Sequence, residues 1–256
     1  MLNIIGHVES CYKTKFGAPR QSGLVKSSFG RIKIRKNLQP EECLEGLEKF
    51  SHLWVIFLFH QNTNHIFRPK IHPPRLAGRS IGTFATRSPH RPNPIGLSVL
   101  KIEKVAAPYI YVSGLDLIDQ TPILDIKPYL NYVDSIEGAK NGWVESVATT
   151  QNHVQFTTQA QETLQKWQKD WQQNALVDGS DREEKGTFGG SSTLKDLIVE
   201  TISLDPRPLL YRETQEGQPN PYKTEHAVYL ANGDVHFRFL SKELAEVFKI
   251  AYPVSA

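Results

Sequence analysis

The chain has 256 residues, a formal net charge of +3 and an apolar fraction of 39%, which fit a soluble globular protein of one large or two modest domains. No apolar run approaches the roughly 20 residues that cross a bilayer, and the first residues lack the pattern of a signal peptide. Because Cys11 and Cys43 form neither a disulfide framework nor a metal-type pair, we expect a cytoplasmic protein with no membrane partner.

The first 135 residues are rich in short candidate strands, separated mostly by Gly, Pro or Asn. The predicted strands cover residues 4–10, 30–36, 51–59, 97–105, 109–118 and 123–130. Amphipathic helices do not alternate with them, so a closed or nearly closed β-barrel is favoured over a doubly wound fold. One short helix is predicted at 40–50, where Leu44 and Leu47 give a narrow apolar stripe.

The second half changes character and predicts helices. Leu164, Trp167 and Trp171 share one face of a helix predicted at 159–173. A second helix is predicted to begin near Thr193, with Asp196 three residues on as a capping box, and to end before the Asp-Pro pair at 205–206.

The last segment predicts a hairpin followed by a helix. Residues 227–230 and 235–239 flank Asn232-Gly233, which is typical of a type I′ turn, and a short helix is predicted at 241–251. We therefore predict a mainly β protein, with an N-terminal β-barrel domain at 1–145 and a smaller α+β C-terminal domain at 150–256.

Basic residues are unevenly distributed. Residues 10–40 hold eight Lys or Arg and residues 61–102 hold seven, and neither segment contains an acid. Such segments favour a polyanion as partner, because phosphates bind to positive fields of this kind. The alternative is a solvated basic face without a ligand.

Four segments carry residues that a core would not select. Residues 16–25 and 71–100 combine Gly, Pro and Arg in stiff turns, in which Arg87 and Arg91 are bidentate donors suited to carboxylate or phosphate. Residues 57–62 end a buried strand in His60-Gln61, and residues 114–130 hold three Asp residues that need partners.

Four strings within these regions resemble one family when they are taken together. FGAPRQ, SHLWVIFLFHQ, GTFATRSPHRPNPIGLSV and LDLIDQTPILDIKPYL, in this order, are similar to the TsaA-like, or TrmO, family over about residues 1–135. Residues 205–212 resemble the C-terminal extension of its bacterial members. The resemblance implies a barrel fold distinct from the Rossmann-like methyltransferases. It also implies transfer of a methyl group from S-adenosylmethionine to N6 of threonylcarbamoyladenosine at position 37, and a homodimer.

The resemblance also implies which residues serve this reaction, with the tRNA anticodon loop as partner and the C-terminal domain as a possible tRNA-binding part. The residues expected to bind the cofactor are Pro19, Arg20, Gln21, His60, Gln61, Arg87, Arg91, Leu97, Asp119, Gln120, Thr121 and Pro122. The catalytic residue stays open between Asp119 and His60 as proton acceptor, and Asp119 could instead contact a cofactor hydroxyl or amine. An arginine is expected to clamp a carboxylate of cofactor or acceptor.

Two other classes of function compete with this enzyme. The basic segments alone fit a noncatalytic RNA-binding module, and the Asp and His residues fit a small-molecule hydrolase, with or without a metal. The histidines at 52, 60, 65, 72 and 90 lack the spacing of a helical zinc motif, so we expect no metal.

Overall fold

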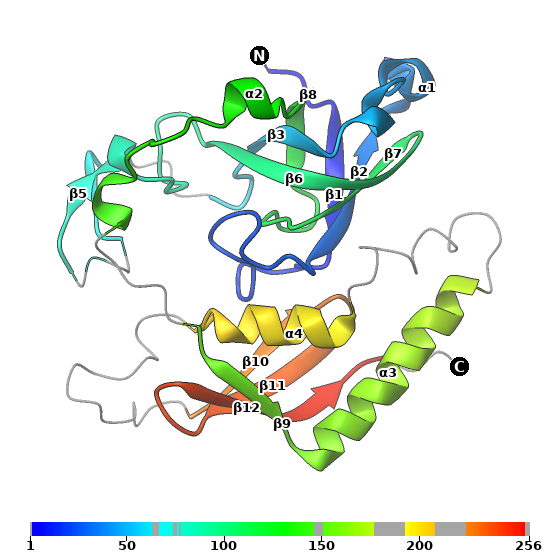
Figure 1. Cartoon of the computed structure of the whole chain (residues 1–256), viewed down its shortest axis with the longest axis vertical. Helices are drawn as coiled ribbons and strands as arrows, with labels where there is room; N and C mark the ends of the chain where they lie inside the picture. Colours follow the sequence, from blue (N-terminus) through cyan, green and yellow to red (C-terminus); the bar gives the residue numbers. More distant parts are fainter. Residues whose placement is uncertain are drawn as a thin grey trace.

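A computed structural model describes residues 2–62, 67–73, 76, 78–145, 151–176, 193–207 and 224–253, with side chains described as far as 172 in the helix that ends at 176. Two parts lie one above the other, a barrel that carries the N-terminus and a sheet flanked by two helices (Figure 1). The mainly β prediction, with a barrel and a smaller α+β part, is confirmed.

The barrel consists of six antiparallel strands that close in the order β1-β2-β7-β6-β3-β8. These are β1 (Gly6–Ser10), β2 (Phe29–Ile34), β3 (His52–Leu58), β6 (Ile95–Ala106), β7 (Tyr109–Ser113) and β8 (Pro122–Pro128). In β3, Leu53, Val55 and Phe57 are buried while their neighbours are half-buried, which is the alternation that a barrel wall requires. This alternation is readable in the sequence.

Antiparallel pairing places three connections at the same rim of the barrel. β1, β3 and β7 end there, while β2, β6 and β8 begin there, as the pairs Ser10↔Gly30, Leu58↔Ile95 and Phe29↔Ser113 show. The connections are residues 11–28, 59–94 and 114–121. The second one includes β4 (Lys70–Ile71), β5 (Ile81–Gly82) and the 3₁₀ turn η4 (Thr83–Ala85).

The opposite rim carries the remaining short elements. These are η1 (Lys36–Leu38), α1 (Pro40–Cys43), η2 (Leu47–Lys49) and α2 (Asn131–Asp134). The predicted helix at 40–50 is wrong in its extent, because Gly46 adopts a left-handed φ of 83° and divides it into α1 and η2. Likewise the strand predicted at 109–118 stops at Ser113, because Gly114 has a φ of 70°.

The second part is a four-stranded sheet in the order β10-β11-β12-β9, in which only β12 and β9 are parallel. Its elements are β9 (His153–Phe156), α3 (Thr158–Leu176), α4 (Leu194–Ser203), β10 (Glu225–Leu230), β11 (Gly233–Phe239) and β12 (Leu244–Ala251), and η5 (Gly142–Val144) precedes it. Both helix predictions are confirmed, and Thr193 and Asp196 form the capping box.

The helix predicted at 241–251 is wrong, because these residues form β12. Ala245 and Val247 are buried and β12 is hydrogen-bonded on both sides, to β11 and to β9. Pairing on two sides therefore outweighs the helix preference of the sequence SKELAEVFKIA.

The hairpin is confirmed, but its turn is displaced by one residue and the predicted type I′ is wrong. Leu230 pairs with Gly233, so Ala231 and Asn232 are central, and only Ala231 has a positive φ, 55°, whereas type I′ requires it at both positions. The indole of Trp167 explains the shift, since its Nε1 donates to Asn232 Oδ1 at 3.0 Å. Its ring also lies so close to Gly233 that a Cβ atom there would be 2.8 Å from it.

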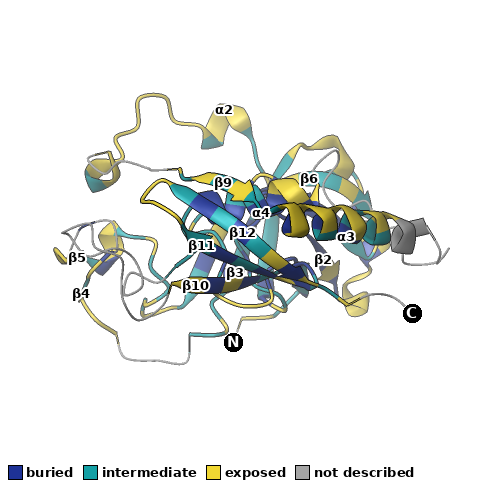
Figure 2. Cartoon of the chain, turned by 90° about the horizontal axis from the view of Figure 1, so that it is seen from below, coloured by how far each residue is buried: buried dark blue, intermediate teal, exposed yellow. Residues whose placement is uncertain are grey.

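The two parts share one apolar cluster. Tyr12, Val25 and Phe29 from the barrel half pack in it with residues such as Trp167 and Leu197. The barrel interior forms a second buried cluster of its own, and strands of both parts contain buried residues (Figure 2). A bridge joins Tyr12 to Leu230. The predicted domain boundary, between 145 and 150, falls at residues 146–150, which are outside the described residues. Within the described residues, no helix has both the length and the apolar character of a membrane span.

Leu197→Ala should lower the free energy of unfolding by about 2–5 kcal/mol, because the Leu197 side chain is fully buried in this shared cluster. Urea denaturation followed by circular dichroism measures the change. Lys195→Ala, on the exposed face of the same helix, is the matched control and should change stability by less than about 0.5 kcal/mol. Equal losses in the two variants would contradict the shared cluster.

Candidate active site

All three connections at the rim carry residues that the sequence nominated, and one hydrogen bond joins two of the connections. Arg87 Nη1 donates to Gln21 Oε1 at 2.6 Å, across 66 residues of sequence. Gln21 in turn donates from Nε2 to the carbonyl oxygen of Arg20 at 2.6 Å. Pro19 is half-buried and Arg20 is exposed, so this corner presents cationic and amide groups to solvent over a fixed backbone.

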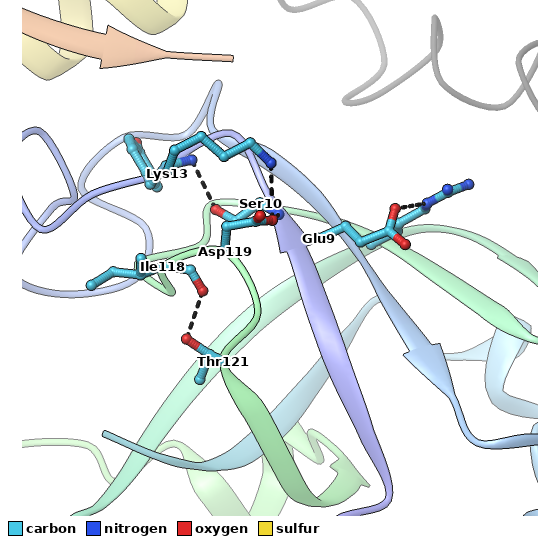
Figure 3. Close-up of polar contacts among 8 residues, drawn as sticks. Glu9, Ser10, Lys13, Ile118, Asp119 and Thr121 are labelled. Carbon is cyan, nitrogen blue, oxygen red and sulfur yellow. Dashed lines mark hydrogen bonds and ion pairs between the residues drawn. The ribbon is translucent and has the colours of Figure 1, made fainter. Parts of the chain in front are cut away.

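Asp119 joins the third connection to the end of β1 (Figure 3). Its Oδ1 accepts from the backbone N–H of Ser10 at 2.8 Å and lies 3.0 Å from Lys13 Nζ. Its own N–H donates to the carbonyl oxygen of Tyr12 at 2.7 Å. The carboxylate is therefore held in one orientation, with a fifth of its side chain, 20%, exposed.

The residues after Asp119 form a tight turn into β8. Gln120 adopts a left-handed φ of 61°, and its N–H donates to Val8 O at 2.8 Å. Thr121 is buried and its hydroxyl donates to Ile118 O at 2.6 Å (Figure 3). Gln120 thus faces solvent, whereas Thr121 stabilises the turn and Pro122 begins β8 opposite His7.

His60 and Gln61 follow β3 at the same rim. Lys15 Nζ, from the first connection, donates to Gln61 O at 2.7 Å. Partial burial lowers the pKa of His60 below its ordinary value of 6.5, and electrostatic interactions with His7 and Lys15 lower it further. The imidazole is therefore neutral at neutral pH and can accept a proton.

Arg91 faces its own loop. Its Nη1 donates to Thr86 O at 2.8 Å and, more weakly, to Thr83 O at 3.4 Å. Asn62 Nδ2 donates to Pro89 O at 3.0 Å, and so fixes the same loop to the end of β3. In this arrangement Arg91 braces the loop, whereas Arg20 and Arg87 are exposed.

Leu97 lies on the wall of the barrel, near the rim. It follows Gly96 and precedes Ser98, both buried, so its side chain points away from the barrel interior and is 52% exposed. It is one of the larger exposed apolar side chains among the described residues.

Sequence reasoning left Asp116 out of the site. Its Oδ1 accepts from the Ser98 hydroxyl at 2.7 Å inside the barrel mouth, and the backbone of Ser22 and the charge of Arg87 act on the same carboxyl. Burial raises the pKa of Asp116 above its ordinary 3.8, although these partners oppose the shift. The sequence did contain a signal for Asp116, which is a charged residue between two leucines. Both leucines, Leu115 and Leu117, are fully buried in the structure.

Lys13 and Lys15 were also missed, because isolated lysines carry no local pattern. Over the described ranges, no group of three or more His, Cys, Asp or Glu side chains is arranged to hold a metal ion. His65, one of the histidines considered for zinc, lies outside these ranges. The site is thus a set of anchored cationic, amide, carboxyl and imidazole groups around one barrel mouth.

Known proteins resemble the chain over the barrel and over its whole length. Residues 7–135 match the family model described as tRNA-methyltransferase O N-terminal domain. A tRNA (adenine(37)-N6)-methyltransferase of Mus musculus is 52% identical over 133 residues, which are 51% of this chain and 31% of that protein. The chain therefore spans about a third of that relative's length.

The bacterial relatives match over nearly the whole chain. A tRNA (adenine(37)-N6)-methyltransferase of Escherichia coli is 35% identical over 239 residues, which are 91% of this chain and 91% of that protein. A crystal structure of TrmO from Pseudomonas aeruginosa superposes with a TM-score of 0.73 at 30% identity, and covers 98% of this chain and 97% of its own.

Asp116→Asn should stabilise the protein at neutral pH and not in acid. A carboxyl whose pKa is raised in the folded state contributes stability below its ordinary pKa of 3.8, and that contribution is lost as pH rises through the folded value. The asparagine variant keeps an oxygen that accepts from Ser98 and avoids the charge. Its gain in unfolding free energy should therefore grow from pH values below 3.8 to neutral pH.

Urea denaturation at the two pH values measures this difference. Asp125→Asn is the matched control, because Asp125 lies outside the barrel mouth and pairs with Lys127 at 3.0 Å. It should show no such gain. A gain of the same size at both pH values in Asp116→Asn would mean that the buried charge is not its cause.

Proposed function

The chain belongs to the tRNA-methyltransferase O family, and from that premise we propose that it is an S-adenosylmethionine-dependent enzyme that methylates N6 of the adenine at position 37 of tRNA. The family model covers half of the chain, and the Escherichia coli enzyme of that name is similar over 91% of it. The observation that carries the proposal is that residues from all four family strings lie at one rim, where the bond between Arg87 and Gln21 joins two of the connections.

The groups at the rim fit the donor in charge and in hydrogen bonding. S-adenosylmethionine carries a carboxylate, an ammonium, ribose hydroxyls and an adenine amine, and supplies the methyl group on a sulfonium. Arg20 and Arg87 are suited to its carboxylate, and the carboxyl of Asp116 is suited to an ammonium or hydroxyl. We propose that Pro19, Gln21, Gln61, Leu97 and the 119–122 turn complete the binding surface, and that Arg91 acts by bracing the loop.

The chain's main contribution to the rate is positioning. Methyl transfer requires the acceptor nitrogen to approach the carbon in line with the breaking bond, and fixed orientation of two reactants supplies a large share of an enzyme's acceleration. A bond from Lys15 to Gln61 joins the first connection to the second, and a bond from Asn62 to Pro89 fixes the second connection internally. We propose that these bonds set the angle at which the two substrates meet.

We propose His60 as the proton acceptor. In threonylcarbamoyladenosine, which we propose as the acceptor, the nitrogen lone pair is delocalised, so removal of its proton assists the attack. Asp119 Oδ1 already accepts from Ser10 N and lies beside Lys13, which suits it to hold a hydroxyl or amine of the donor. His60 is exposed at the rim and neutral.

The partner is proposed to be the anticodon loop of tRNA, bound by the basic segments at 10–40 and 61–102, with a contribution from the α+β part at 150–256. A cut near residue 150 is a poor test of that contribution, because it removes the side chains that cover Tyr12, Val25 and Phe29. Substitutions in the full chain are therefore the better approach.

We also propose a cytoplasmic homodimer. Tyr132, Val133 and Ile136 expose 84%, 58% and 74% of their area on the segment that follows the barrel, which is a surface that a second copy is suited to cover.

Methyl transfer is tested with the purified full chain, S-adenosylmethionine and tRNA from cells that lack the gene. Mass spectrometry of the digested tRNA should show threonylcarbamoyladenosine gaining one methyl group. tRNA prepared without threonylcarbamoylation should remain unmodified. A chain that binds tRNA but gives no calorimetric signal with S-adenosylmethionine would instead be a noncatalytic RNA-binding module.

The role of His60 predicts a pH profile. Because its pKa is lowered, kcat/KM should rise with pH through a value below 6.5 and then level off. His60→Asn should lower kcat by about 10²–10⁴-fold and abolish that acidic limb. His52→Asn, at the other end of β3, is the control and should leave the profile unchanged. An acidic limb that persists in His60→Asn would assign the proton to another group.

A further inference from the structure

The most exposed phenylalanine of the described residues lies on the rim loop, and the proposed chemistry does not use it. Phe84 is the middle residue of η4 (Thr83–Ala85) and exposes 72% of its side chain. Exposure of a large apolar ring to water is unfavourable, by roughly 25 cal/mol for each Å² left uncovered. Its exposure is informative where the backbone beneath it is fixed and other exposed rings lie beside it.

The turn beneath Phe84 is fixed. The Thr86 hydroxyl donates to Thr83 O at 2.7 Å, and Arg91 Nη1 donates to Thr86 O at 2.8 Å. Trp143 Nε1, from η5 after the barrel, donates to Ala85 O at 2.8 Å. The segment after α2 accordingly runs beside the β4–β5 hairpin (Figure 1). Bonds on both flanks thus hold the ring in an exposed position.

Phe84 is also one of a pair. The ring of Phe67, itself 44% exposed, lies with its centroid 6.3 Å from that of Phe84 and its plane inclined by 28°. The guanidinium carbon of Arg91 lies 5.5 Å from the centroid of the Phe84 ring. An exposed aromatic pair with an adjacent cation is suited to bind another flat, electron-rich ring by stacking.

The charge around the pair narrows the class of partner. The sequence from 61 to 102 contains no acid, and Arg68, Lys70 and Arg79 are described members of its basic set. Aromatic rings within a positive surface are the usual way in which proteins hold unpaired nucleotides, since the rings stack on bases and the cations meet phosphates.

We propose that Phe84 and Phe67 form a stacking platform for an unpaired base of the RNA substrate, distinct from the base that is methylated. This inference rests on the proposed function. The platform binds a nucleotide of the loop while the neighbouring basic side chains bind its phosphates, and so holds the reacting adenine at the barrel mouth.

The test compares Phe84→Leu, which keeps an apolar side chain on the turn, with Phe84→Trp, which keeps an aromatic one. Phe84→Leu should raise the KM for tRNA by about tenfold and leave the affinity for S-adenosylmethionine unchanged in calorimetry. Phe84→Trp should restore the wild-type KM. Phe50→Leu, an exposed phenylalanine at the opposite rim, is the matched control and should change neither quantity.

A direct signature of stacking completes the experiment. An anticodon stem-loop that carries a fluorescent purine in the loop should be quenched by the wild type and by Phe84→Trp, and much less by Phe84→Leu. Normal tRNA KM in Phe84→Leu, with a wild type that methylates tRNA, would overturn the platform and leave the proposed function intact. Weaker binding of S-adenosylmethionine, or loss of a dimer in sedimentation, would overturn it in favour of a donor contact or a subunit contact.

Discussion

Antiparallel closure of the six-stranded barrel is the constraint on which the site depends. Because each strand reverses direction relative to its neighbours, successive connections alternate between the two ends of the barrel, and those at residues 11–28, 59–94 and 114–121 emerge at the same end. Motifs that are separated by as much as 66 residues then lie within hydrogen-bond distance of one another. No single connection contains a complete set of donor and acceptor groups. The full set of groups forms only where the three connections lie together at the rim.

A second constraint is the apolar cluster that the second part shares with the first connection and with the start of β2. Residues of the first connection, such as Val25, are buried by side chains of the C-terminal half, so the backbone on which Arg20 and Gln21 stand is supported from below. Ser27 strengthens this support, since its N–H and hydroxyl both donate to the carboxylate of Glu200 on α4, at 2.9 and 2.8 Å. The second part therefore stabilises the rim whether or not it binds RNA.

Local patterns predicted much of the fold. Strand alternation in β3, the apolar face of α3 and the capping box of α4 are all determined by residues close in sequence, and these predictions hold. The failures have long-range causes. β12 is a strand because it is paired on both edges, and the hairpin turn is displaced because Trp167, far away in sequence, packs on Gly233. The same division applies to the site. The motif strings, which include Asp116, were identifiable, whereas the pairing of Asp116 with Ser98, the contact of Lys13 with Asp119 and the inward orientation of Arg91 depend on tertiary contacts.

The contact between Glu200 and Ser27 also bears on how such proteins can diverge. A barrel that acquired a different C-terminal half through recombination would leave Tyr12, Val25 and the two donors of Ser27 without their partners. Each uncovered group would lower the free energy of unfolding. The new half would therefore form a stable protein only if it supplied an apolar surface and a hydrogen-bond acceptor at matching places. The two halves are therefore expected to evolve together. Chimeras between distant members of the family should fold stably only when these junction residues are exchanged as a set.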